Sequence, residues 1–379
     1  DAPIIQTFST GTKALPGLTA LAKAIEAGEV KTLFVTSEAD PVFDAPADLG
    51  VRGLFRKVEQ VVHLGVRNNL TARAADWHVP GAHYLESWGD WHTLSGDYTV
   101  QQPMIRPLFG GRSEIEFLLS LLQDPAPEPV AIEEGAADEA TGSDDPAPAE
   151  EGGEEAVAAV APAPAMAPGP EPEAPALVAV KETFSEVVGE GGDWSLTLRE
   201  GFAKGSKFKR GGEPAVDLAA VGGMAFADLP HPNGGFEVSL APSHHTYDGR
   251  FANNGWMLEV PDPITKLTWD NVAHLSWATM DALELESGDQ INVTVGETTV
   301  RVPAMRNPGQ ADYTIQLPAG FYGKIRGDGG DRIETGSIST GTGFNVWPLR
   351  TTDAIADSMV GASVEKTGKK YELAQTCLL

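Results

Sequence analysis

The sequence predicts an α/β layer with a parallel sheet, followed by a mainly β, barrel-like domain, with an acidic disordered insertion between them. Helix and strand patterns alternate in residues 1–123, whereas patterns with a period of two dominate residues 181–360. The composition of residues 124–180 is unlike either part. At about 100–200 residues per domain, a chain of 379 residues has room for two domains.

The first part alternates helices with strands. Apolar residues recur at i, i+3, i+4 and i+7 from Leu18 to Ile25, and Gly28 stands where a helix stop belongs, which predicts a helix over 15–27. The elements expected next are a strand over 31–37, a turn at Asp40-Pro41, a helical stretch over 47–58, a strand over 60–64, a short helix over 70–77, a loop-rich run over 79–111 and a helix over 112–122. This alternation favours a parallel sheet.

Residues 124–180 are acidic and rich in alanine and proline. They contain 14 acidic residues, no basic residue, and 11 of the 28 prolines of the chain. Such a segment cannot bury enough apolar surface to offset the loss of chain entropy, so we expect a disordered linker or surface insertion. An acidic tether that docks a basic partner is the alternative.

Strand patterns dominate after this linker. Alternating apolar and polar residues, bounded by turn residues, predict strands over 236–240, 290–295, 298–302 and 312–317. The Gly296-Glu297 pair between two of these runs predicts a hairpin, and a short helix is expected over 277–285. We assign residues 181–360 to the barrel-like domain and residues 361–379 to a C-terminal tail.

The composition excludes several classes of protein. With 54 acidic and 27 basic residues, the chain lacks the cationic surface that nucleic-acid binding needs. Its single cysteine, Cys377, excludes an internal disulfide framework and a protein-ligated iron–sulfur cluster, which needs about four thiolates. No apolar run of about 18 residues occurs, so we expect no membrane span. The chain begins at Asp1 without a signal-peptide pattern, which we interpret as a processed product or a fragment.

Several long strings resemble one family. They are Thr32-Leu-Phe-Val35, Asp40-Pro-Val-Phe43, ADWHVPGAHYLESWGD over 75–90, residues 96–113, WMLEVPDPITKLTWDN over 256–271 and GTGFNVWPLR over 341–350. Together they resemble the molybdopterin-oxidoreductase (DMSO reductase) superfamily, and within it the large molybdopterin-like iron–sulfur subunit of alternative complex III. The resemblance covers about residues 30–122 and 236–352.

The resemblance implies both a fold and a role. It implies a Rossmann-like layer in residues 1–123 and, from residue 181, a double-psi β-barrel of the kind that helps hold a pterin dinucleotide in molybdenum enzymes. The implied role is a non-catalytic scaffold of a membrane-associated quinol:electron-acceptor oxidoreductase in respiratory or photosynthetic electron transfer. The implied partners are an iron–sulfur domain, a multiheme cytochrome and integral quinol-binding subunits, at the periplasmic side of the bacterial inner membrane. Iron–sulfur clusters and hemes are expected in those neighbours, and no cofactor, pterin–molybdenum included, in this chain.

The chain also departs from the family pattern. The sequence lacks the N-terminal half that carries the cysteine-rich motif and the molybdenum ligand in catalytic relatives, and the ferredoxin-like portion that follows the barrel in the complex III subunit. We therefore expect a middle piece or one product of a split gene. The alternative function is the C-terminal half of a catalytic molybdenum bis-pterin reductase of the polysulfide or thiosulfate type. A third interpretation is a free-standing binding module that kept the fold and lost the complex.

One group of residues is a candidate metal site. His78 and His83, with Glu86 and Asp90 nearby, offer imidazole and carboxylate ligands. Because Pro80-Gly81 interrupts the segment, the two rings do not share a helix face. We expect hydrogen-bonded members of a structured loop instead.

The remaining motifs indicate little chemistry. His244 and His245 are adjacent and point apart if extended, so we expect no shared metal. Gly341-Thr-Gly343 allows close approach of a pterin or phosphate, but we expect a structural turn. Cys377 is expected to be an inert thiol, and Glu154-Glu155 lies in the linker, where nothing holds it for acid–base work.

Two local clusters complete the candidates. The first is basic and consists of Lys204, Lys207, Lys209 and Arg210. We interpret it as a solvated loop, with anionic lipid or an acidic surface, including the linker of this chain, as alternatives. The second is aromatic and consists of Trp77, Tyr84, Trp88 and Trp91. We expect it to pack in the core, with subunit contact as the alternative. No residue is assigned as catalytic, cofactor-binding or metal-binding.

Overall fold

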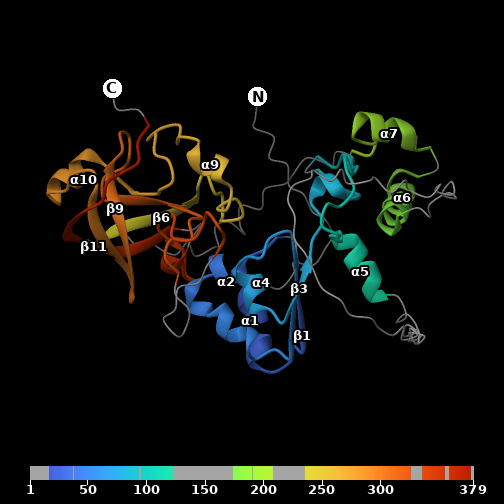
Figure 1. Ribbon diagram of the computed structural model, residues 1–379, viewed down its shortest axis with the longest axis horizontal. Coiled ribbons are helices and arrows are strands. Elements are labelled where there is room, and N and C mark those ends of the chain that lie inside the picture. Colours follow the sequence, from blue (N-terminus) through green and yellow to red (C-terminus); the bar gives the residue numbers. More distant parts are fainter. Residues whose placement is uncertain are drawn as a thin grey trace, which may run out of the picture.

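The structure, a computed structural model, describes residues 17–36, 38–93, 95–122, 174–189, 191–207, 235–325, 335–354 and 358–376. The acidic stretch over 124–173, the basic residues Lys209 and Arg210, and Cys377 therefore lie outside the described residues. The described chain forms an α/β unit, a small unit of helices on a two-stranded ribbon, and a β-barrel (Figure 1). None of the described helices is long and apolar enough to cross a membrane.

The α/β unit is built on a parallel sheet with the strand order β1 (Thr32–Val35), β2 (Gln60–Gly65) and β3 (Trp77–Pro80). Its helices are α1 (Leu18–Glu26), α2 (Pro41–Asp44), α3 (Val51–Phe55) and α4 (Leu70–Ala74). The predicted alternation of helices and strands is confirmed for α1, β1 and β2. The third strand was missed because its residues span the end of a predicted helix and the start of a predicted loop.

Two local predictions in this unit were wrong. The helix expected over 47–58 is divided, because Gly50 adopts a φ of 55° between η1 (Ala47–Leu49) and α3. Asp40-Pro41 was expected to be a turn but begins α2, since proline is favoured in the first turn of a helix.

The second unit contains the helix expected over 112–122, which is confirmed, together with elements that lie in the predicted loop, linker and barrel domain. It consists of η2 (Tyr84–Glu86), β4 (Gly89–His92), β5 (Tyr98–Gln101), α5 (Glu114–Leu122), α6 (Pro175–Val188) and α7 (Trp194–Glu200). Helix α6 corrects the linker boundary at residue 180, because Val180 is fully buried and Phe184 packs near Tyr98 of β5. Helices α6 and α7 also correct the predicted start of the barrel domain at residue 181. Their apolar side chains pack against the ribbon rather than against the barrel.

The barrel is closed and has the strand order β10, β6, β11, β8, β9, β7. The strands are β6 (Phe236–Pro242), β7 (Ala273–Leu275), β8 (Asp289–Val295), β9 (Thr298–Arg306), β10 (Thr314–Ala319) and β11 (Ser358–Lys370), accompanied by α9 (Gly255–Glu259), α10 (Trp277–Ala282) and η3 (Trp347–Leu349). The mainly β domain and the β8–β9 hairpin at Gly296-Glu297 are thus confirmed. The tail assigned from residue 361 is wrong, because β11 continues to Lys370 and pairs with β8.

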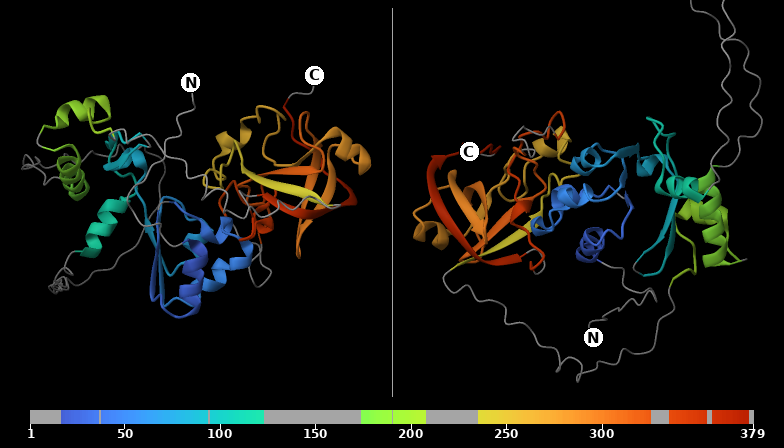
Figure 2. Two further views of the ribbon diagram at one scale, coloured as in Figure 1. Left: turned by 180° about the vertical axis from the view of Figure 1, so that it is seen from behind. Right: turned by 90° about the horizontal axis from the view of Figure 1, so that it is seen from below.

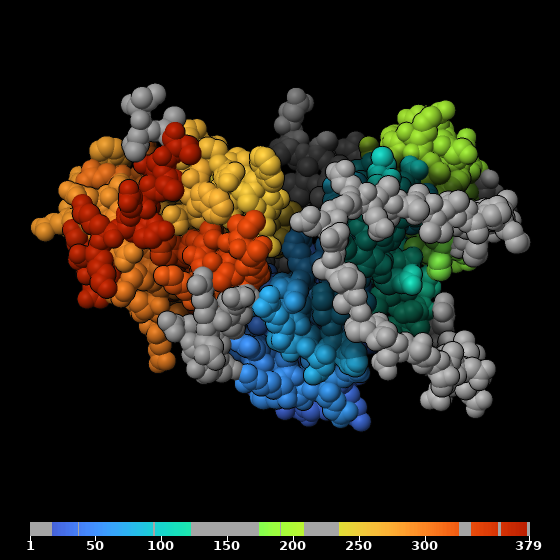
Figure 3. All heavy atoms as spheres, viewed as in Figure 1, coloured from blue at the N-terminus to red at the C-terminus, as the bar shows by residue number. Residues whose placement is uncertain are grey.

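The α/β unit lies between the barrel and the second unit in the views of Figures 1 and 2. The space-filling view shows the α/β unit directly against the barrel (Figure 3). Phe43 of α2 and Leu70 of α4 belong to the same buried apolar cluster as barrel residues such as Leu240 and Leu317. The two units therefore share a core, and the cleft between them is a defined feature of the fold.

Candidate functional site

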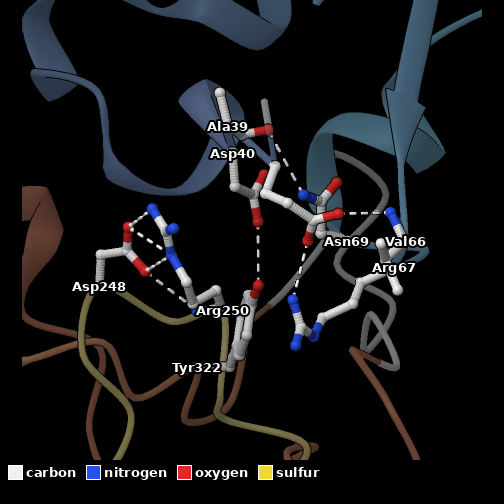
Figure 4. Close-up of polar contacts among 9 residues, drawn as sticks. Ala39, Asp40, Val66, Arg67, Asn69, Asp248, Arg250 and Tyr322 are labelled. Atoms are coloured by element: carbon white, nitrogen blue, oxygen red, sulfur yellow. Dashed lines mark hydrogen bonds and ion pairs between the residues drawn. The ribbon is translucent and has the colours of Figure 1, made fainter. Parts of the chain in front are cut away.

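A cleft of about 370 Å³ lies between the α/β unit and the barrel. Its walls contain residues that follow β1 and β2 and residues of barrel loops, among them Glu38, Asp40, Arg67, Asn69, Asp248, Arg250 and Tyr322 (Figure 4). Ligands of open α/β sheets bind at the carboxyl ends of the strands. The position of the cleft at the ends of β1 and β2 makes it the candidate site.

The side chain of Asp40 lies at the N-terminal end of helix α4. Its carboxylate accepts hydrogen bonds from the backbone N–H of Thr71 at 2.9 Å and of Leu70 at 3.4 Å, and from the Thr71 hydroxyl at 2.7 Å. Asn69 caps the same helix by accepting the N–H of Ala72. The N–H groups at a helix N-terminus are a common phosphate-binding position. Here the carboxylate of Asp40 already binds them.

Tyr322 connects Asp40 to the barrel. Its hydroxyl donates to Oδ2 of Asp40 at 2.9 Å, and its ring stacks on Phe43 with the centroids 4.1 Å apart. Burial raises the pKa of Asp40 although these hydrogen bonds oppose the shift. Burial and the nearby Asp40 also raise the pKa of Tyr322, so the phenol stays a donor. This contact is a buried polar link between the two units.

Both cleft arginines next to this link are paired with carboxylates. Arg67 lies 2.8 Å from Glu38, and its guanidinium stands over the ring of Phe251. Arg250 binds Asp248 through Nε and Nη2, the shorter distance being 2.7 Å. The Asp248 hydrogen bonds raise the pKa of Arg250. The two pairs lie on opposite sides of Tyr322 (Figure 4).

Asp44 is a further, partly buried acid near Asp40. Burial, helped by the charges of Asp40 and Asp248, raises its pKa from 3.8 to about 7, against the opposing effect of Arg350. The guanidinium of Arg350 donates to the backbone carbonyl of Asp44 at 3.0 Å. Close by, Asp48 accepts the backbone N–H of Thr352 at 3.0 Å, which adds another bond between the units.

The cleft does not fit the diphosphate of a pterin dinucleotide. Its lining combines four carboxylates, from Glu38, Asp40, Asp44 and Asp248, with three arginines. Arg67 and Arg250 are paired, and Arg73 is the third. Since a diphosphate is recognised by free cations and helix N-termini, it would have to displace carboxylates of this chain.

The candidate metal residues have other partners. His78 Nδ1 lies 2.9 Å from Nδ1 of the buried His63 on the neighbouring strand, and burial lowers the pKa of both imidazoles. His83 and Glu86 form a capping box on η2, and Asp90 accepts a hydrogen bond from Tyr98. In the part of the chain that the structure describes, no three His, Cys, Asp or Glu side chains are arranged to hold a metal ion.

The other predicted motifs are placed as follows. Gly341 and Gly343 adopt φ values of 81° and 63°, and a Cβ on Gly343 would lie 2.4 Å from Phe321, so the turn packs on the barrel. His245 is buried, whereas His244 is exposed. Of the basic cluster, Lys204 and Lys207 lie on the surface near Glu200 and Asp97.

The aromatic set is exposed rather than buried, which corrects the core assignment. Trp77, Tyr84 and Trp91 expose 63%, 60% and 53% of their surfaces, and only Trp88 packs inside, near Trp194. Further exposed apolar side chains follow in the same segment at Met104, Leu108, Phe109 and Leu122. Large exposed apolar surfaces mark contact sites. Subunit contact remains the alternative interpretation of this aromatic set.

Little in the sequence marks the residues of the cleft. Asp40 is part of a predicted turn and of one string that resembles the superfamily, but no local pattern marks Asp248, Arg250 or Tyr322 as site residues. The Asp248-Gly249 dipeptide is a turn signal, but nothing local indicates its partners. Tyr322 and Asp40 are 282 positions apart, so only the tertiary structure brings them together.

Comparison with known proteins is limited to the fold. No protein-family model matches the chain, and no curated protein matches it. Among solved structures, acetylene hydratase from Pelobacter acetylenicus is similar over 92% of this chain, with a TM-score of 0.58 and 14% identity. The chain spans 46% of the length of that protein. The likeness shows a shared fold.

Proposed function

We propose that this chain is a non-catalytic scaffold of a membrane-associated quinol:electron-acceptor oxidoreductase, of the alternative complex III type, within the molybdopterin-oxidoreductase superfamily. The sequence strings over 75–90 and 256–271 support the superfamily, as does the shared fold with acetylene hydratase, a member of the DMSO reductase family. The fold alone does not choose between scaffold and enzyme.

One observation carries the scaffold role. At the end of β2 and the start of α4, backbone N–H groups bind the carboxylate of Asp40, which Tyr322 links to the barrel. The neighbouring arginines Arg67 and Arg250 are paired with acids of the chain itself. These residues join two units of the fold, and their pairing leaves a diphosphate few free cations to bind, which supports a non-catalytic role.

A second observation supports assembly with partners. The segment from β3 to α5 exposes large apolar side chains, of which Phe109 at 88% and Leu122 at 83% are the most exposed. Interfaces are enriched in such aromatic and aliphatic anchors. The proposed partners are an iron–sulfur domain, a multiheme cytochrome and integral quinol-binding subunits, on the periplasmic side of the inner membrane.

The test is purification of the chain from its native membranes, with mass spectrometry of its partners and analysis of molybdenum, iron and heme on the same sample. The scaffold role predicts a multiheme cytochrome, integral subunits and iron, with molybdenum far below one atom per chain. Stoichiometric molybdenum together with pterin would overturn this role and indicate one half of a reductase.

A further inference from the structure

Strand β1 lies at an open edge of the parallel sheet. The strand order is β1, β2, β3, and in the part of the chain that the structure describes β1 pairs with β2 alone. Thr32-Leu-Phe-Val35 contains neither the proline nor the charged residue that often protects an edge strand. Phe34 in this strand is 42% exposed. Such an edge is a template on which one more strand can pair.

An apolar cavity of about 280 Å³ lies beside this edge. It is lined by α1, β1, α3 and residues that follow β1, and among these described residues Thr36 alone has a polar side chain. Leu33 and Phe34 both line the cavity, although neighbouring residues of a strand point to opposite faces of the sheet. The cavity therefore reaches the edge of β1, where an added strand can insert an apolar side chain.

The helices on the sheet determine on which side a preceding strand would lie. Helices α1 and α3 pack on the same face, because both share a buried cluster with Val35 of β1 and Val61 of β2. Connections between parallel strands of one sheet are right-handed in about 98% of cases. The connection from β1 to β2 passes through α3 on this face. A connection of the same hand through α1 starts from a strand on the side of β1 opposite to β2, which is the open edge.

The residues before α1 have the composition of such a strand. Residues 1–16 precede Gly17, where the described chain starts next to the first residue of α1. Within them, Ile4-Ile-Gln-Thr-Phe8 combines β-branched residues with an aromatic one, and Ser9-Thr-Gly-Thr12 is rich in turn residues. The eight residues 9–16 can span about 26 Å, twice the length of about 13 Å of helix α1. They are therefore long enough to connect the open edge to the start of α1.

We propose that residues 4–8 of this chain dock on the open edge of β1 as a fourth parallel strand and insert an apolar side chain into the cavity beside α1. The outward backbone groups of β1 are then paired, and α1 becomes the connection of a βαβ unit. This proposal is independent of the scaffold role. It closes one edge of the sheet and leaves the surface from β3 to α5, at the opposite edge, as the surface for partners.

The experiment is hydrogen–deuterium exchange of the full chain at several protein concentrations, followed by mass spectrometry of its peptides. We expect the backbone N–H groups of residues 4–8 to exchange about a hundredfold more slowly than in a free peptide of the same sequence, as in a paired strand. Exchange at the rate of the free peptide would overturn the proposal. Protection of β1 that increases with protein concentration, without protection of residues 4–8, would show instead that a second copy pairs with this edge.

Matched variants separate docking from folding. Ile5→Asp places a charge in the proposed strand, whereas Thr12→Asp places the same charge in the connecting residues. Ile5→Asp should speed the exchange of residues 4–8 and of β1 about tenfold or more, and Thr12→Asp should change neither. Strand β8, which pairs on both sides within the barrel, reports on folding and should exchange as in the wild type. Wild-type exchange of β1 in Ile5→Asp would contradict the docking, and the wild-type measurement decides the question if Ile5→Asp does not fold.

Discussion

The hydroxyl of Tyr322 shows how one residue can join two units of this protein. From the barrel side it donates a hydrogen bond to Oδ2 of Asp40. The other carboxylate oxygen of Asp40 already accepts the backbone N–H of Thr71 in α4. A hydrogen bond of this kind contributes little compared with a hydrogen bond to water, but breaking it leaves Oδ2 of the partly buried Asp40 with only the 3.4 Å contact from the backbone N–H of Leu70. The free-energy cost of removing the Tyr322 hydroxyl is therefore set by the hydrogen bond that Asp40 loses.

The variant Tyr322→Phe tests this bond. We expect it to lower the free energy of unfolding by about 1–3 kcal/mol, because Asp40 loses a buried donor while the ring still stacks on Phe43. Urea denaturation followed by tryptophan fluorescence measures the change. Tyr313→Phe is the matched control, since Tyr313 is 56% exposed. A stability equal to that of the wild type would show that water replaces the phenol without cost.

Asp44 gives the molecule a predictable pH dependence. Its pKa is about 7 in the folded chain, mainly because of burial, and 3.8 is its ordinary value. Between about pH 4 and pH 7 the folded state therefore holds a proton that the unfolded state has lost. Stability falls as the pH rises through this interval, because deprotonation places a charge in a partly buried site near Asp40 and Asp248.

The variant Asp44→Asn should remove this contribution. Its free energy of unfolding relative to the wild type should increase from pH 4 to pH 7, by at most about 1.4 kcal/mol per pH unit. Urea denaturation at several pH values measures the slope. Asp353→Asn removes the same charge from an exposed position and controls for net charge. A slope identical in Asp44→Asn and the wild type would contradict the assignment.

At the scale of elements, a loop of the barrel fits closely against helix α2. Gly249 adopts a φ of 125°, and a Cβ at this position would lie 2.6 Å from Cε1 of Phe43. Neither the backbone conformation nor the space admits a side chain. The approach of the two units thus depends on a glycine next to the Asp248–Arg250 pair.

The variant Gly249→Ala tests this packing. We expect a loss of about 3 kcal/mol or more, because a steric clash adds to backbone strain. Gly309→Ala is the matched control, since Gly309 also has a positive φ, 85°, but faces open space. The control should lose only about 1–2 kcal/mol. Thermal unfolding measures both, and equal losses would mean that contact with Phe43 is unimportant.

At the scale of the whole molecule, the side of the α/β unit that meets the barrel differs from the segment that runs from β3 into the second unit. One side shares a core with the barrel through Phe43 and Leu70. The segment from β3 to α5 instead leaves aromatic and aliphatic side chains exposed, with Trp77 at 63% and Phe109 at 88%. Burying this apolar surface against a partner would favour the free energy of binding by about 25 cal/mol per Å², from which the entropic costs of association are subtracted.

The double variant Trp77→Ser, Phe109→Ser tests this surface. It should unfold within about 0.5 kcal/mol of the wild type, because surface changes away from packed groups cost little. In native membranes it should lose the subunits that purify with the wild type. Trp256→Ser removes a tryptophan that is 82% exposed on the barrel and should keep them. Retention of all partners by the double variant would contradict the proposed contact surface.

Local patterns in the sequence determined the first helix, the β8–β9 hairpin and its turn. The stripe from Leu18 to Ile25, the alternating runs of β8 and β9, and the turn at Gly296 each bury or pair their residues as the periodicity requires. The same patterns indicated a β domain after an α/β layer. These features depend on neighbours in the chain, and neighbours are visible in a sequence.

Tertiary structure alone decided the rest. The cleft combines Asp40 with Tyr322, which lie 282 positions apart in the chain. The exposure of Trp77 and Phe109 likewise follows from which faces the other units cover. Helix α6 formed at the end of an acidic stretch because the ribbon buries Val180 and Phe184. Burial and long-range contact are properties of the folded chain, and no short pattern encodes them.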